Sequence, residues 1–397
     1  MAVSTLSGRL IFVGLMAWAA KAGAELVPTL KLAVEERYDD DRLLQTNPQA
    51  SSGQMVTKLS PMIGLDVKER TLNAHSFYAA DLYVHSADGT TGVDHRAVID
   101  FKDELSHRFA LDSKLEVWRV SDPTSLPRGG LARTRSPILY GSAELAGAQR
   151  LTRLTTLRVG YRFEGTKIYE TDPDPVDPTI RRPRPPGFAH APFAELWYRL
   201  SRRSEIGVEY RFQYLSFGTQ SSDANSVAAM YRFRISPEVK LALKLGPTYY
   251  QKLDSDPGDP SRSGWTPRVI FDLTRDAHGS RIGFSLGHEL AGASGFISGV
   301  WTEYASLYGA QKFFRDFSIL GGAAFYRNGP AAHVAMDSFS GPQVVKGYWV
   351  NAGLEWQLMR EVSLTGTFTR LSQLAGFGGG GGLSRNVVAL RLVYTAL

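Results

Sequence analysis

Residues 205–214 read EIGVEYRFQY, and this stretch decides the fold class. Apolar or aromatic side chains at positions 206, 208, 210, 212 and 214 alternate with Gly207, Glu209, Arg211 and Gln213. A period of two places the first set on one face of an extended chain and the second set on the other face. The stretch therefore predicts a β-strand with one apolar and one polar face.

The same alternation recurs along most of the chain after residue 24. Residues 154–169 and 238–250 repeat it. A hairpin plan, in which two such strands flank a short polar turn, recurs at 150–163, 199–212, 234–245, 312–326 and 357–368. The spacing of these hairpins is uneven, so they are not solenoid repeats. The pattern predicts 18 strands, with 16 as the alternative because several strands alternate less cleanly.

The connections between the expected strands alternate in length. Short turns are expected near residues 70–73, 105–107, 149–152, 201–204, 236–238, 276–280, 314–316 and 359–361. Between them lie connections that are mostly long and rich in Gly, Pro, Asp and Ser, at 39–53, 86–94, 122–133, 170–188, 217–224, 252–264, 291–295, 328–343 and 374–385. Successive connections of an up-and-down sheet lie at opposite rims, so one rim is short and the other long. Outer-membrane barrels have this asymmetry.

The composition excludes several other classes of protein. The 397 residues include no cysteine, which excludes a disulfide scaffold, a cysteine zinc site and a thiol nucleophile. The charges, 45 Lys+Arg against 39 Asp+Glu, form no blocks, so we expect no nucleic-acid partner. The eight His residues are scattered without a metal-binding motif. We therefore expect no metal, no cofactor and no enzymatic activity.

The first 24 residues predict a cleavable secretory signal. Arg9 precedes an apolar run at 10–20, which is shorter than the roughly 20 residues that span a bilayer. The sequence Ala22-Gly23-Ala24 fits the small-x-small cleavage rule. We expect residues 1–24 to be removed on export, and residues 25–397 to form one domain without a transmembrane helix.

A sheet of this size with one apolar face has few stable arrangements. Barrels with a filled interior use about eight strands, and a much larger number leaves a lumen too wide to fill. The apolar face must then point into lipid, where every backbone group needs a partner and the sheet must close. The predicted fold is all-β, a single antiparallel up-and-down transmembrane β-barrel. Tyr and Trp residues near strand ends suit its interfacial girdles: Tyr38, Tyr214, Tyr249, Trp265, Tyr348, Trp356 and Tyr394.

The signal, the alternating strands, the unequal connections and the terminal strand NVVALRLVYTAL (386–397) resemble a Gram-negative outer-membrane β-barrel. This resemblance covers residues 25–397. It implies an outer-membrane location, contact with outer-membrane lipid and insertion by the barrel assembly machinery. The chain departs from the usual pattern because the outward register of its last strand ends on Ala396 and not on an aromatic residue.

The polar face between residues 154 and 275 supplies the candidate pore-lining residues. It carries nine bases and four acids, whereas the strands before it carry seven bases and eight acids. Walls of Arg and Lys select anions. The alternative is that these bases pair with acids on neighbouring strands and only hold the wall together. The candidates are Arg158, Arg162, Arg199, Arg211, Arg232, Arg234, Lys240, Lys244, Arg268, Glu195, Glu209 and Asp272.

These features predict a channel for hydrophilic solute. The leading hypothesis is export of an exopolysaccharide, because the densely charged lumen is similar in architecture to the barrel subunits of exopolysaccharide export systems. Periplasmic export components would then be partners. The alternative is a passive porin with anion preference for a small anionic solute. A third possibility is a structural or surface-display barrel whose lumen is closed by side chains and by the connections 170–188 and 328–343.

Overall fold

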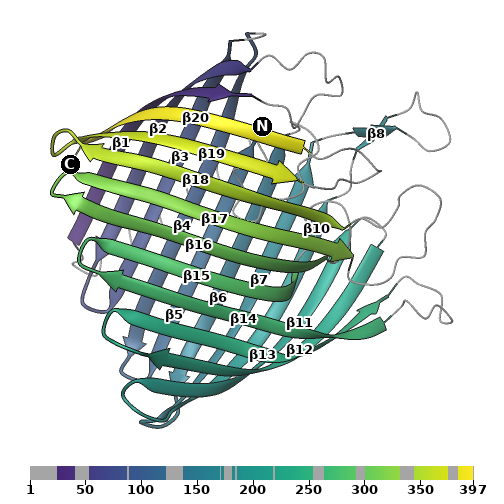
Figure 1. The fold of residues 1–397 in the computed structure, drawn as a ribbon. Coiled ribbons are helices and arrows are strands. Elements are labelled where there is room, and N and C mark those ends of the chain that lie inside the picture. The colour runs from purple at the N-terminus through teal and green to yellow at the C-terminus, as the bar shows by residue number, and fades with distance from the viewer. Residues whose placement is uncertain are drawn as a thin grey trace.

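The 18 predicted strands form one closed antiparallel barrel (Figure 1). The structure is a computed structural model, and it describes residues 25–40, 53–86, 89–121, 137–169, 171–173, 181–183, 186–217, 220–253, 263–291, 300–330, 344–373 and 383–396. The alternative of 16 strands is wrong. The predicted signal at 1–24 lies outside the described residues. Within the described residues, no helix is long and apolar enough to cross a membrane.

The wall strands are long enough to cross a bilayer, since a tilted transmembrane strand needs about 9–11 residues. They run from 12 to 16 residues. In chain order they are β1 (Glu25–Asp39), β2 (Gln54–Lys68), β3 (Leu72–His85), β4 (Thr91–Ser106), β5 (Phe109–Val120), β6 (Ile138–Arg150), β7 (Thr155–Ile168), β10 (Gly187–Arg199), β11 (Ser204–Phe217), β12 (Gln220–Arg234), β13 (Val239–Lys252), β14 (Ser263–Ala277), β15 (Ser280–Ala291), β16 (Val300–Phe314), β17 (Phe317–Pro330), β18 (Val345–Gln357), β19 (Val362–Gln373) and β20 (Leu383–Ala396).

The barrel closes where the first wall strand meets the last. β1 pairs with β2 on one side and with β20 on the other, from Leu30 opposite Ala396 to Asp39 opposite Val387. A closed ladder leaves no edge strand whose backbone groups would lack partners in lipid.

A buried ion pair joins the two strands at this seam. Arg385 Nε donates to Asp39 Oδ1 at 2.9 Å, and both side chains are at least 95% buried. Beside them, the backbone N–H of Asn386 donates to Asp40 Oδ1 at 2.7 Å. The paired residues are 346 positions apart in the sequence, so these contacts form only when the barrel is closed.

The outer surface of the barrel is apolar, as predicted. On β1, Leu32 and Val34 are each 43% exposed, whereas Ala33 between them is 3% exposed. Aromatic side chains lie on the same outward face toward both rims, among them Trp265 and Trp356. An apolar band between aromatic girdles is the surface of an outer-membrane barrel, and it places this surface in contact with lipid.

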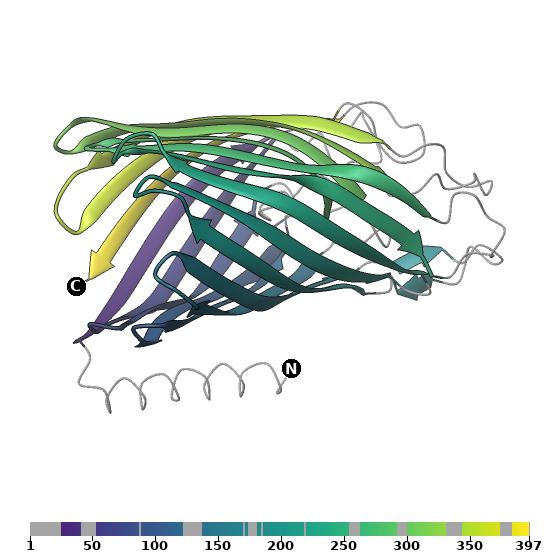
Figure 2. The ribbon, with the colours of Figure 1, turned by 90° about the horizontal axis from the view of Figure 1, so that it is seen from below.

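The eight predicted short turns are all present and lie at one end of the barrel (Figure 2). They are residues 69–71, 107–108, 151–154, 200–203, 235–238, 278–279, 315–316 and 358–361. In the two-residue turn between β14 and β15, Gly279 has a φ of +75°, which an L side chain rarely adopts. All eight expected short turns are thus confirmed, and eight of the nine expected long connections have five or more residues.

The prediction of a long connection at 217–224 is wrong. β11 ends at Phe217 and β12 begins at Gln220, so only two residues join them. The segment looked like a loop because it is rich in Ser, Asp and Asn. Its inward residues are instead small and closely packed, since Ser222 and Ser226 are at most 1% exposed and the Ser226 hydroxyl lies 2.8 Å from that of Thr248.

The connection expected at 170–188 contains a small hairpin. β8 (Thr171–Pro173) pairs with β9 (Arg181–Pro183), outside the barrel sheet. Both views place this pair beyond the strand ends at the rim of the long connections (Figures 1 and 2). β7 and β10 pair directly, so the hairpin does not interrupt the wall.

Replacing Asp39 with Ala should destabilise the barrel by about 3–5 kcal/mol, because it leaves the Arg385 guanidinium buried without its carboxylate. The measurement is the urea concentration at the midpoint of unfolding in detergent, and unfolding is monitored by the loss of heat-modifiable migration on a gel. Asp66→Ala is the control, because it breaks the exposed Asp66–His75 pair and should cost less than about 1 kcal/mol. Equal shifts in the two variants would contradict a stabilising role for the seam pair.

Candidate functional site

All twelve predicted pore-lining residues lie on the face of the wall opposite to lipid. Glu209 shows the arrangement, because it is fully buried while Val208 and Tyr210 beside it are 53% and 48% exposed on the outer face. By strand, the residues are Arg158 and Arg162 on β7, Glu195 and Arg199 on β10, Glu209 and Arg211 on β11, Arg232 and Arg234 on β12, Lys240 and Lys244 on β13, and Arg268 and Asp272 on β14.

Glu209 is the centre of an ion-pair network on this face. Its Oε1 accepts from Arg268 Nη1 at 2.8 Å and lies 3.0 Å from Arg211 Nη2. Its Oε2 accepts from Lys244 Nζ. Glu209, Arg268 and Arg211 come from β11 and β14, and Lys244 comes from β13. One buried carboxylate is therefore surrounded by three cations.

The network continues around the wall through Glu195. Lys244 Nζ donates to Glu195 Oε1 at 3.1 Å, and Glu195 Oε2 lies 3.8 Å from Arg158. Arg158 also donates to Glu144 on β6 at 2.9 Å, and Arg162 donates to the same carboxylate at 2.6 Å. The ions on β6, β7, β10, β11, β13 and β14 are thus linked into one chain of opposite charges.

This pairing decides between two interpretations of the basic face. Arg158, Arg162, Arg211, Lys244 and Arg268 are held by carboxylates of the wall, as the alternative interpretation predicted. A buried charge without a partner would be strongly destabilising. Four wall carboxylates, Asp112, Glu144, Glu195 and Glu209, face these five bases, which leaves a formal charge of +1 (5 − 4).

Aromatic rings support the same part of the wall. The guanidinium carbon of Arg232 lies 3.8 Å from the centre of the Trp197 ring, and that of Arg158 lies 5.0 Å from the Phe193 ring. Trp197 Nε1 donates to Glu195 Oε2 at 3.1 Å. Gly207 leaves room for this ring, because a Cβ there would lie 3.0 Å from Trp197 Cε3.

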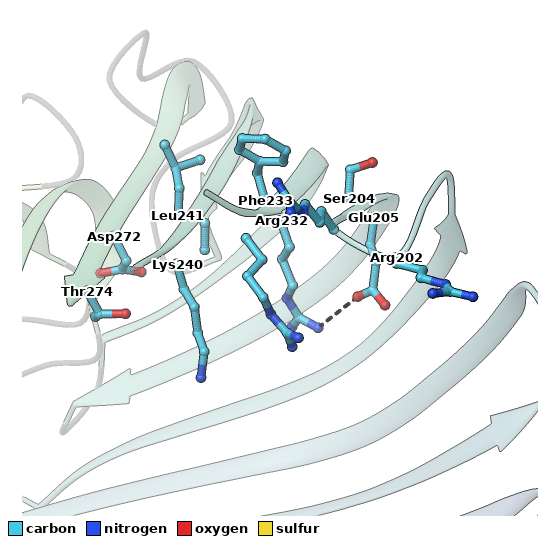
Figure 3. Close-up of a pocket in the computed structure, with 12 residues that line it drawn as sticks. Arg202, Ser204, Glu205, Arg232, Phe233, Lys240, Leu241, Asp272 and Thr274 are labelled. Carbon is cyan, nitrogen blue, oxygen red and sulfur yellow. Dashed lines mark ion pairs between the residues drawn. The ribbon is translucent and has the colours of Figure 1, made fainter. Parts of the chain in front are cut away.

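A second group of charges lies at the short-turn rim, in an open cavity of about 310 Å³ (Figure 3). Arg232 and Lys240 extend side by side into this space in the close-up, with Glu205 and Asp272 on either side. The complete charged lining is Arg202, Arg203, Arg232, Arg234, Lys240, Glu205 and Asp272. Five cations against two carboxylates leave a formal charge of +3 (5 − 2). We call these residues the rim cluster.

Most cations of the rim cluster have no carboxylate partner. Glu205 lies 4.0 Å from Arg232 and 3.6 Å from Arg199 outside the cavity, and Asp272 accepts a hydrogen bond from Ser285 at 2.7 Å. Within the part of the chain that the structure describes, Arg202, Arg203, Arg234 and Lys240 form no ion pair. Four cations without an ion-pair partner are therefore gathered in one cavity.

Arg202 and Arg203 were missed by the sequence analysis. They lie in the turn between β10 and β11, where no two-residue period assigns a side chain to a face. The signal that was available is the run of basic residues in RLSRRSEIG, at 199–207.

The opposite part of the wall is also paired. On β3, Asp81 lies 3.1 Å from both Lys58 on β2 and Arg96 on β4. Among the described residues, no group of three His, Cys, Asp or Glu side chains is placed to hold a metal ion. The rim cluster is thus one place on the lumen face where uncompensated charge can act on a solute.

Comparisons with known proteins identify no family for this chain. No protein-family model and no curated protein sequence matches it. Its fold is similar to that of OccK2 (OpdF) of Pseudomonas aeruginosa in complex with glucuronate, at 11% identity and a TM-score of 0.46, over 94% of this chain and 99% of the other. OpdO of the same species matches at 11% identity and a TM-score of 0.42, over 94% and 97% of the two chains. OccAB4 of Acinetobacter baumannii matches at 10% identity and a TM-score of 0.43, over 93% of this chain and 98% of the other.

The Glu209→Gln substitution should lower the free energy of unfolding by about 3–5 kcal/mol. It keeps the side-chain shape but leaves Arg211, Arg268 and Lys244 around a neutral amide in a buried place. Urea unfolding followed by tryptophan fluorescence measures the change. Glu205→Gln is the matched control, because Glu205 is a half-exposed partner at the rim, and its loss should cost less than about 1 kcal/mol. A Glu209 variant as stable as the Glu205 variant would refute the role of Glu209.

Proposed function

We propose that the protein is a passive outer-membrane channel for small hydrophilic solutes, with a preference for anions. The observation that carries the proposal is the contrast between the wall and the rim cluster. Bases within the wall are paired with carboxylates, whereas four bases of the rim cluster have no ion-pair partner among the described residues. Unpaired cations lining a pore favour anions and disfavour cations.

The position of the rim cluster suits this role. In outer-membrane barrels the short turns face the periplasm, which would place the cluster at the periplasmic mouth of the lumen. Exposed charges act over about 8 Å at physiological ionic strength. A concentrated group at one mouth can therefore bias every ion that passes close to this part of the wall.

The same contrast favours the porin hypothesis over the leading hypothesis of polysaccharide export. A long acidic polymer would be guided best by a track of free cations along the whole lumen. The five paired cations between β7 and β14 are instead mostly compensated by Asp112, Glu144, Glu195 and Glu209. The rim cavity of about 310 Å³ is at the lower end of the size range of small-molecule sites. A small anion is therefore the proposed solute.

Reversing two rim charges tests the origin of the selectivity. Arg234→Glu/Lys240→Glu should shift the reversal potential in planar bilayers under a KCl gradient toward cation preference, because the cavity changes from +3 to −1. The matched control is Arg315→Glu/Arg360→Glu, which makes the same change of net charge in two short turns outside the cavity. A similar shift in both variants would mean that the effect is not local to the rim cluster.

Liposome swelling distinguishes a small-solute channel from a polymer exporter. Proteoliposomes should swell in glucuronate, an anionic monosaccharide that was bound in one of the matched structures, faster than in a neutral sugar of similar size. They should not swell in a long acidic polysaccharide, which is much larger than the ligands that small-molecule sites hold. Equal permeation of the polysaccharide would favour export, and no swelling with any solute would favour the structural barrel.

A further inference from the structure

Three cations lie on the outer, lipid-facing surface of neighbouring strands β17, β18 and β19. They are Arg327, Lys346 and Arg370, and all three side chains are exposed. Each belongs to the outward register of its strand, in line with Phe325, Val350 and Phe368, which are 42–43% exposed. The three side chains therefore point away from the lumen, toward the membrane.

The three cations form one patch around Tyr348. Arg327 and Lys346 are direct partners in the β17–β18 ladder. Tyr348, two residues beyond Lys346 on the same face, is the ladder partner of Ser372, and Arg370 lies two residues before Ser372 on that face. We call Arg327, Lys346, Tyr348 and Arg370 the outer basic patch.

The outer basic patch is only partly compensated. Glu303 on β16 accepts from Arg327 Nη1 at 3.1 Å. Among the residues that the structure describes, no carboxylate lies within ion-pair distance of Lys346 or Arg370. Three cations against this one carboxylate leave a formal charge of +2 (3 − 1) on the face that meets lipid.

The depth of the patch matches the headgroup region. Arg327 lies three residues before the end of β17, Lys346 is the second residue of β18, and Arg370 lies three residues before the end of β19. These are the strand ends next to the long connections (Figure 1). A basic side chain on the lipid face of a barrel costs a few kcal/mol at the bilayer midplane but about 0–1 kcal/mol near the interface. The patch therefore sits where lipid phosphates lie.

Other strands at this rim carry different residues on the outer face. β11, β13 and β14 present Tyr214, Tyr249 and Trp265, which form an uncharged aromatic girdle. β1 presents the acid Glu36, and Asp40 follows directly after the end of this strand. Two further outward cations, Arg119 on β5 and Lys167 on β7, lie at this rim on either side of β6. Three cations on three neighbouring strands occur on β17–β19 among the described residues.

We propose that the outer basic patch binds the phosphate groups of a lipid in the outer leaflet. Arginine offers paired N–H donors that fit phosphate oxygens, and lysine adds a compact charge. Glu303 would hold the Arg327 guanidinium in place on one side, and the Tyr348 ring lies between Lys346 and the strand that carries Arg370. The site faces lipid, so it does not depend on the proposed channel function.

Native mass spectrometry of the detergent-solubilised barrel tests the proposal by titration with a bisphosphorylated glycolipid. The variant Arg327→Gln/Lys346→Gln/Arg370→Gln should lose about fivefold in affinity for each cation removed, the typical contribution of one basic residue near an anionic membrane surface. The matched control is Arg275→Gln/Arg315→Gln/Arg360→Gln, which removes the same number of cations at the opposite, short-turn end of the barrel. The control should bind like the unmodified protein.

Two further ligands separate the sources of phosphate. The dephosphorylated form of the same glycolipid should bind weakly and equally to all three proteins, and binding as tight as that of the phosphorylated form would overturn the proposal. Inorganic phosphate at the same concentrations should leave no stable adduct, whereas a stable adduct would identify a site for a soluble anion instead. If the triple variant does not fold, the single variant Lys346→Gln replaces it. The Lys346 side chain has no ion pair among the described residues, so its loss should still lower the affinity for the glycolipid about fivefold.

Discussion

The constraint on which this structure depends is that lipid offers no partner for a backbone N–H or C=O group. Every wall strand therefore pairs on both sides, and β1 and β20 must meet. The Asp39–Arg385 pair lies at this meeting point, between residues 346 positions apart. The two-residue period follows from the same constraint, because a closed sheet in lipid has one face toward hydrocarbon and one toward the lumen.

A second constraint acts on the lumen face, because a charge that is buried in the wall also needs a partner. Glu209 is the ion-pair partner of three cations, one each from β11, β13 and β14. Glu195 and Glu144 continue the ion pairs toward β7. Charge can remain unpaired where solvent reaches it, at the short-turn rim and at the outer interface. The rim cluster and the outer basic patch are these two places, one facing the solute and the other facing lipid.

Much of the fold could be predicted from the sequence, because period, turn residues and connection length are local properties. The 18 strands and the eight short turns follow from them. The strand at 220–234 was partly read as a loop, because its small polar inward residues resemble loop composition and only their packing in the wall shows otherwise. The lumen residues were assigned to the right face and their pairing was predicted as an alternative, but the identity of each partner was not predictable. Lys244 donates a hydrogen bond to Glu195, which lies 49 residues earlier and three strands away in the barrel. The alternation within one strand cannot predict a contact between strands so far apart.

The central claim is that free cations at the rim cluster, and not the paired bases of the wall, give the channel its preference for anions. The most direct measurement is the reversal potential of the unmodified protein in planar bilayers, repeated across ionic strengths. Solvent-exposed charges are screened over about 10 Å at 0.1 M salt and about 3 Å at 1 M. The account predicts anion selectivity at 0.1 M that weakens markedly toward 1 M. Conductance that is cation-selective or unselective at 0.1 M, or the absence of conductance, would contradict it.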